Sequence, residues 1–465
     1  MKLKNLIKEL TPTQVIIFGF IGIILVGTFL LCLPISNNSD TFTPILTALF
    51  TSTSAVCVTG LVLVNTLSYW SLFGKIVILI LIQIGGLGFM AIITMIYLLF
   101  RRRISLRSRL IIQESFNQPS FHGMVALVRK AIKGTLIIEA ICAILLTLVF
   151  LSKSNTTPLK SLFWGIFHSV SAFCNAGFDI IGDSSLTGYV HNPFFNFIIM
   201  FLIVSGGIGF AIWVDLLRVF NFNFLYVKAN FVKKCKKLTL HSKIALTVTV
   251  CLIFLGGFIF LILEYSNPLT IGTFTFNEKL LASFFHSVSL RTAGFNTISM
   301  GDLRDTSKLI SVFYMLIGGS PGGTAGGLKT VTFAIVILTV YSVMKGQTST
   351  VVFNRTIPVQ MLRKALSVTI IYIIIFFIAT FLLMLIEEPY HYSFLDIAFE
   401  VSSALGTVGL TTGLTPDLST LSKLVIIFCM FIGRLGPISI GVALTTKLTE
   451  TNNSLEYVEE NVLVG

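Results

Sequence analysis

The chain repeats one short motif four times, and this repeat restricts the folds that the chain can adopt. Each copy starts with a serine, ends with a glycine followed by a bulky apolar residue, and lies between two long apolar segments. The copies occupy residues 54–61, 171–178, 289–295 and 403–410. Successive glycines of the motif lie 117, 117 and 115 residues apart. This regular spacing predicts four copies of one structural unit.

Composition places the units in a membrane. The chain of 465 residues is 54% hydrophobic and only 11% charged, with a mean hydropathy of +0.91. Soluble globular domains carry roughly a quarter charged residues, so an ordinary soluble protein is excluded. The chain is therefore expected to be an integral membrane protein that contacts the lipid bilayer.

Each copy has the same plan of a long apolar segment, a short one, the motif and a second long segment. The first long segments cover residues 14–33, 135–151, 245–263 and 367–386, and the short ones 43–55, 159–173, 277–290 and 393–405. The second long segments cover residues 75–100, 196–220, 308–344 and 423–447. A helix of about 20 apolar residues spans a bilayer. We expect an all-α protein with eight transmembrane helices in four tandem repeats around one central pore, with pseudo-fourfold symmetry. The repeats would be residues 1–100, 101–220, 221–344 and 345–465.

The basic residues orient the chain. The segments that this plan places on the same side of the membrane as the N-terminus hold 23 of the 33 lysines and arginines. An excess of Lys and Arg marks the cytoplasmic side, so both termini are expected in the cytoplasm and the protein in the plasma membrane. The net charge of +13 is then explained by topology, and no nucleic acid partner is expected.

The motif loops are candidates for a selectivity filter. A short helix that cannot cross the bilayer, followed by glycine-rich backbone, must return to its own side, and such backbone is tolerated where it lines a wet cavity. Rings of backbone carbonyls select among alkali cations, and the absence of carboxylates in these runs favours a monovalent cation. The alternative is that the glycines only permit close helix packing. The predicted ion ligands are the carbonyls of Val58, Thr59, Gly60, Asn175, Ala176, Gly177, Thr292, Ala293, Gly294, Thr407, Val408 and Gly409.

A second glycine-rich run interrupts the second long segment of the third copy. It contains six glycines and a proline, which cannot hold a helix. Its residues are Gly318, Gly319, Ser320, Pro321, Gly322, Gly323, Thr324, Ala325, Gly326 and Gly327. A nucleotide-binding loop is disfavoured because Leu328 stands where the pattern needs lysine. We predict an intramembrane loop below the filter, named here the glycine-rich loop, that acts as a gate.

Two arginines lie inside apolar surroundings. Arg434 follows a glycine of the fourth copy, and its charge is costly within a membrane. It is interpreted either as a charge near the gate, which limits cation passage or bonds to free carbonyls, or as a structural tie between copies three and four. Arg291 precedes the third filter run, where it either anchors the short helix or contacts ions.

Together these residues resemble the Trk/Ktr/HKT superfamily of potassium transporters, and most closely its KtrB type. The resemblance rests on the four filter runs, the glycine-rich loop and Arg434, and it extends over nearly the whole chain. It implies potassium as the transported ion, because all four filter positions carry glycine. It also implies a homodimer with one pore per subunit and a cytoplasmic RCK-type nucleotide-binding regulatory subunit.

Two other classes of protein fit the sequence less well. A cation-coupled secondary transporter with alternating access remains the alternative, although such proteins usually use inverted repeats and ionisable groups near the midplane. An enzyme is not expected, because the spans contain no nucleophile, metal-ligand set or acid–base pair. No organic cofactor is expected.

Overall fold

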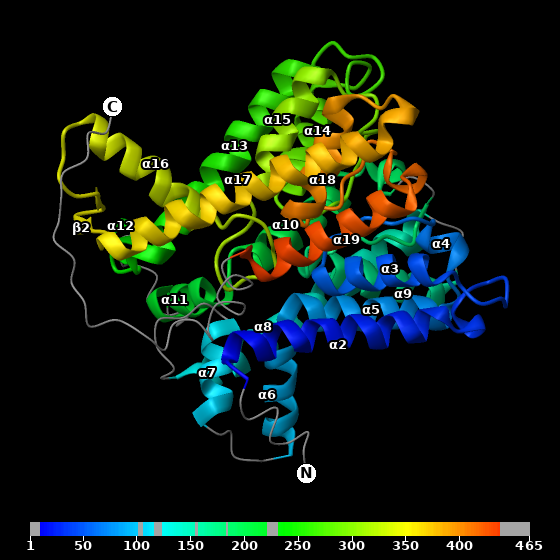
Figure 1. The fold of residues 1–465 in the computed structure, drawn as a ribbon, viewed down its shortest axis with the longest axis horizontal. Coiled ribbons are helices and arrows are strands. Elements are labelled where there is room, and N and C mark those ends of the chain that lie inside the picture. The colour runs from blue at the N-terminus through cyan, green and yellow to red at the C-terminus, as the bar shows by residue number, and fades with distance from the viewer. Residues whose placement is uncertain are drawn as a thin grey trace.

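The computed structural model describes residues 10–100, 106–115, 123–153, 157–182, 185–220 and 231–437. Both chain termini, the three arginines at 101–103 and the predicted span beyond residue 437 lie outside the described residues. The described part of the chain is mainly helical (Figure 1).

In the part of the chain that the structure describes, four helices are long and apolar enough to cross a bilayer. They are α2 (Pro12–Cys32), α8 (Met124–Lys153), α13 (Leu240–Glu264) and α17 (Val359–Glu387). The start of α2 is fixed by a capping box, in which Thr11 accepts a hydrogen bond from the backbone of Gln14 and the Gln14 side chain accepts one from Thr11 N–H. These helices establish a multi-pass membrane protein, whereas the predicted count of eight spans stays a prediction.

A short helix follows each long one and packs against it. The short helices are α3 (Ile45–Cys57), α9 (Pro158–Phe173), α14 (Phe276–Ser289) and α18 (Phe394–Gly406). Every residue of α18 from Ile397 to Gly406 is buried, while the long helices expose large apolar side chains such as Phe29, Phe258 and Phe381. The short helices therefore form the interior, and the long helices present an apolar outer surface suited to lipid.

The second long segments are broken into two helices where the structure describes them fully. The pieces are α5 (Leu72–Leu87) and α6 (Phe89–Leu99), α10 (Pro193–Gly207) and α11 (Phe210–Phe220), and α15 (Asp305–Leu316) and α16 (Thr330–Met344). The segment 196–220 was expected to be one span, but α10 and α11 meet at an angle of 99°. Gly209 explains the bend, because its φ of 101° is incompatible with a right-handed helix.

The last helix, α19 (Thr420–Leu435), closes the arrangement. The helices α5, α10 and α15 each pack on the short helix of the next copy, namely α9, α14 and α18. In the same way α19 packs on α3, the short helix of the first copy. The first and last copies are therefore in contact, although they lie at opposite ends of the sequence.

The remaining elements connect these helices. They are η1 (Pro34–Ser36), α4 (Thr66–Tyr69), α7 (Leu106–Ser115), η2 (Thr187–Tyr189), α12 (Phe231–Lys236), η3 (Glu388–Tyr390), η4 (Thr415–Asp417) and the strands β1 (Val351–Val352) and β2 (Arg355–Thr356). The strands form an antiparallel hairpin in which Val351 pairs with Thr356. With α16, this hairpin projects from the body of the molecule at the left of Figure 1.

Candidate functional site

The four motif loops have the same backbone conformation. In each copy, one residue just beyond the end of the short helix has a left-handed φ. The values are 58°, 60°, 67° and 52° in chain order. These residues are Val58, Asn175, Thr292 and Thr407. Two positions later the motif glycines have φ of 93°, 68°, 77° and 96°. Residues with a Cβ rarely adopt such values, which explains the glycine in every copy.

The serine of each motif holds its loop. In copies one and four the serine hydroxyl accepts a hydrogen bond from the motif glycine, Ser54 from Gly60 N–H and Ser403 from Gly409 N–H, both at 3.0 Å. In copies two and three the serine hydroxyl donates to the carbonyl after the glycine, at Phe178 or Phe295. A hydrogen bond in each copy thus explains why a serine stands shortly before every motif glycine, six residues before it in three copies and five in the third.

The loop backbone directs its hydrogen-bond donors back toward the helices. The N–H of the residue before each motif glycine donates to a carbonyl of the preceding helix, at 2.7 to 3.0 Å. These donors are Thr59, Ala176, Ala293 and Val408. In contrast, none of the predicted ligand carbonyls accepts a hydrogen bond from any residue that the structure describes. Buried carbonyls without protein partners are costly unless water or an ion satisfies them.

The four loops meet in a ring. A Cβ built on Gly60 would lie 3.0 Å from Cα of Gly177, and a Cβ on Gly177 would lie 3.0 Å from Cα of Gly294. A Cβ on Gly294 would lie 3.2 Å from Cα of Gly409, and one on Gly409 would lie 3.0 Å from Cα of Gly60. The order therefore runs through all four copies and returns to the first. The structure brings all four predicted runs together.

The glycine-rich loop lies against two of these runs. No helix is present between Ile317 and Lys329, in agreement with the composition of this segment. Thr324 Oγ1 donates to the carbonyl of Phe173, at the end of α9, at 3.1 Å. A Cβ on Gly326 would lie 2.8 Å from Cγ2 of Thr407. The loop is therefore in contact with the inner ends of the second and fourth motif regions.

The break between α10 and α11 receives the glycine-rich loop. Ser320 N–H donates to Gly207 O at 2.9 Å, and Thr324 N–H donates to Gly206 O at 3.2 Å. In the other direction Phe210 N–H donates to Gly322 O at 3.0 Å. The carbonyls and amides released by the broken helix are thereby satisfied by the loop, which fixes the loop in position.

Arg434 bonds to the loop from the opposite side. Its guanidinium donates to the carbonyl of Thr324 and to those of Gly85 and Gly86, the last at 3.1 Å. The loop is thus tied to the end of α5 in copy one as well as to α19 in copy four. Lys329 also turns toward the loop, and its Nζ donates to Ala325 O at 2.6 Å. Both interpretations of Arg434 have support, since it is a charge at the loop and also a tie.

A cavity of about 500 Å³ adjoins the glycine-rich loop. Pro321, Gly322, Ala325 and Lys329 of the loop segment contribute to its wall, together with Arg434. On one side the loop contacts the motif region, and on the other it borders this cavity. The same loop thus contacts two of the motif regions and borders the cavity.

The family model of TrkH, described as a cation transport protein, matches residues 7–456. The chain belongs to the TrkH family. Membership makes it a membrane transporter and not an enzyme.

Relatives within the TrkH family match over nearly their whole length. The potassium/sodium uptake protein NtpJ of Enterococcus hirae is 39% identical over 99% of both chains. The Ktr system potassium uptake protein B of Bacillus subtilis is 39% identical over 98% of this chain and 97% of its own. The solved structure of the potassium transporter TrkH from Vibrio parahaemolyticus shares the fold, with a TM-score of 0.69 and 17% identity, over 93% of this chain and 86% of that one.

One buried acidic residue of this TrkH-family chain was not singled out from the sequence. Glu400 on α18 is fully buried and accepts hydrogen bonds from the hydroxyls of Thr411 and Thr415 and from Thr412 N–H at 3.0 Å. It therefore fixes the segment that follows the fourth motif. The sequence signal that could have led to this role is a carboxylate within an apolar helix, followed by three threonines just beyond the motif.

We expect Ser403→Ala to destabilise the fourth loop. The substitution leaves the buried Gly409 N–H without its acceptor, at a cost of about 1–3 kcal/mol. Thermal unfolding of the purified protein measures this loss. Ser402→Ala is the matched control, because the Ser402 hydroxyl bonds only within its own helix, to Phe399 O. Equal unfolding temperatures for the two variants would contradict the role given to Ser403.

Proposed function

We propose that this chain takes up potassium across the plasma membrane through one central pore. The proposal is that the four tandem repeats predicted from the sequence surround this pore, with eight spans and pseudo-fourfold symmetry. Two relatives support potassium as the ion, since their names describe potassium/sodium uptake and potassium uptake. The single observation that carries the proposal is the ring of motif glycines, in which each glycine lies against the next copy.

Selectivity is proposed to come from the carbonyls at the predicted filter residues. An ion enters only if these oxygens replace its hydration shell. Two features support this role: the carbonyls accept no hydrogen bond from the described residues, and the loop N–H groups point back to the helices. Uncharged ligands bind a monovalent ion without trapping it, so that it can leave again.

The glycine-rich loop and Arg434 are proposed as the gate. Two contacts support this role: the loop touches two of the motif regions and also borders the cavity. Arg434 and Lys329 place two positive charges beside the loop, and each donates to a loop carbonyl. These charges oppose cation passage until the loop moves. Opening then requires either that the Arg434 hydrogen bonds break or that the Arg434 side chain moves together with the loop.

Assembly and orientation belong to the same proposal. The relatives named as parts of a Ktr system suggest a transporter with several components. We infer a homodimer whose loops are controlled by a cytoplasmic RCK-type nucleotide-binding subunit. Both termini would then lie in the cytoplasm, as the distribution of basic residues predicts.

Ion flux into liposomes tests this function. The purified protein is reconstituted alone, and uptake of labelled rubidium is measured in competition with potassium and with sodium. Strong competition by potassium and weak competition by sodium, with no requirement for a second ion gradient, is the expected result. Uptake that depends on a sodium or proton gradient would instead favour the coupled transporter.

A further inference from the structure

Arg291 carries a buried charge without a counter-charge. Its side chain is only 7% exposed. Its Nε has no hydrogen-bond partner, and the side chain makes no hydrogen bond or ion pair with any residue that the structure describes. The predicted role of anchoring the short helix through such bonds is therefore not visible. A buried cation is strongly unfavourable unless an acceptor or an anion compensates it.

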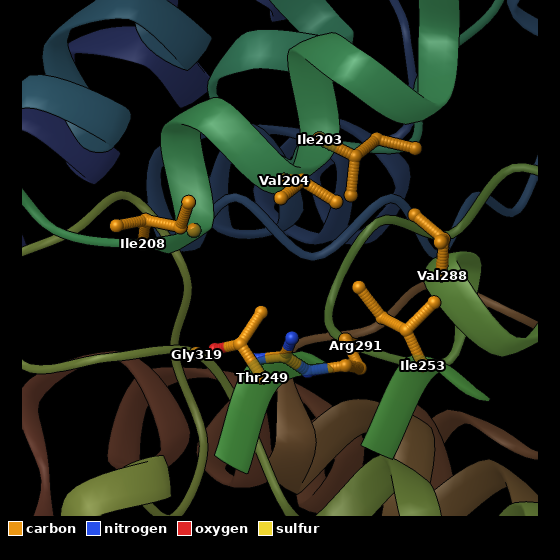
Figure 2. A pocket seen from close by; sticks show the side chains of 9 residues that line it. Ile203, Val204, Ile208, Thr249, Ile253, Val288, Arg291 and Gly319 are labelled. Carbon is orange, nitrogen blue, oxygen red and sulfur yellow. The ribbon is translucent and has the colours of Figure 1, made fainter. Parts of the chain in front are cut away.

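The guanidinium reaches a small pocket between α10, α13 and the glycine-rich loop. Figure 2 shows it extending toward Thr249 and Gly319, with apolar side chains of α10 across the pocket. Thr249 Oγ1 is buried without a hydrogen-bond partner. Among the described residues, no acceptor is found for Gly319 N–H. Arg291, Thr249 and Gly319, from three separate segments of the chain, thus line one pocket.

The size and the lining residues of the pocket indicate which class of ligand it binds. Its volume is about 10 Å³, which limits the occupant to a single water molecule or one monatomic ion. No carboxylate is among the described residues that line it. A water would accept hydrogen bonds from some of these donors but would leave the charge uncompensated. A small monovalent anion accepts from the Arg291 guanidinium and the Thr249 hydroxyl and also neutralises Arg291.

We propose that this pocket binds a halide-sized monovalent anion, with Arg291 as the counter-charge and Thr249 as a second donor. Arg291 precedes the third filter run by one residue, and Gly319 belongs to the glycine-rich loop. The anion therefore joins the backbone of the filter region to the loop. It also cancels a positive charge close to the proposed cation pathway, a consequence that rests on the proposed function.

Chloride-dependent stability tests the site without any ion flux. Thermal unfolding of the detergent-solubilised protein is followed by tryptophan fluorescence in potassium chloride and in potassium gluconate of equal ionic strength. A ligand that binds only the folded state raises the unfolding temperature in a saturable manner. We expect this rise with chloride, its loss in Arg291→Gln, and about a tenfold higher half-saturating chloride concentration in Thr249→Val.

The controls separate this site from general salt effects. Arg304→Gln removes an exposed arginine and should keep the full chloride response. Thr249→Val retains Arg291, so it remains informative even if Arg291→Gln does not fold. Equal unfolding temperatures of the wild type in chloride and gluconate would overturn the proposal, with water as the occupant. An unchanged chloride response in Arg291→Gln or Thr249→Val would overturn it as well. Neither outcome would affect the proposed potassium pathway.

Discussion

Gly294→Ser is expected to lower the preference for potassium over sodium by about tenfold or more, equivalent to about 1.4 kcal/mol of discrimination. The substitution puts a Cβ where φ is 77°, a conformation that residues with side chains rarely adopt. That Cβ would also lie 3.2 Å from Cα of Gly177 and of Gly409 and would press on the carbonyl of Val408. The ring must widen or the carbonyls must turn, and either change alters how well they replace a hydration shell.

Rubidium uptake in competition with potassium and sodium measures this change. Gly188→Ser is the matched control, because a Cβ at Gly188 has no neighbour within 4 Å and its position in η2 lies outside the ring. The control should retain the selectivity of the wild type. If Gly294→Ser transports with unchanged selectivity, the motif carbonyls are not the filter, and the glycines are needed only for packing.

Deletion of residues 321–325 is expected to raise the basal cation flux of the reconstituted protein by about tenfold or more, the effect of removing a barrier of about 1.4 kcal/mol. The deletion removes the part of the loop that bonds to Gly206 and Arg434. The shortened loop can be closed, because a Cβ on Gly318 would lie only 3.1 Å from Cα of Gly327. Selectivity should persist, since the filter residues remain.

Arg434→Gln gives a milder form of the same experiment. It removes the charge beside the loop and weakens the tie to Thr324 and α5. We expect a smaller rise in flux than after the deletion. Arg363→Gln, on the exposed start of α17, is the control for the loss of one positive charge. Low flux in both the deletion and Arg434→Gln, in protein that is folded, would contradict the gate and leave Arg434 as a structural tie.

Much of the architecture was accessible from the sequence because it is encoded locally. The apolar segments predicted the long helices α2, α8, α13 and α17, since length and hydropathy suffice to identify a helix in a bilayer. The glycine and proline content of residues 318–327 predicted the absence of a helix there. The serine and glycine spacing predicted four equivalent loops, because each loop is held by a short-range hydrogen bond.

Other features depend on contacts between distant segments, which no local pattern encodes. The two hydrogen-bonding modes of the motif serines, the bend of 99° at Gly209 and the carboxylate of Glu400 beneath its threonines were not predicted. The partners of Arg434 in copies one and three lie 348 and 110 residues away. Whether the Arg291 side chain finds a hydrogen-bond or ion-pair partner among the described residues likewise depends on segments that are distant in the sequence.

The sequence alone determined that the chain is a membrane protein with four copies of one short motif, because hydropathy and motif spacing are properties of consecutive residues. Only the tertiary structure decided which motif glycines lie together and which groups have no partner among the described residues. The closure of the glycine ring from the fourth copy back to the first requires α19 to pack on α3. That contact is a long-range one, so its energy depends on the whole fold and not on any single segment.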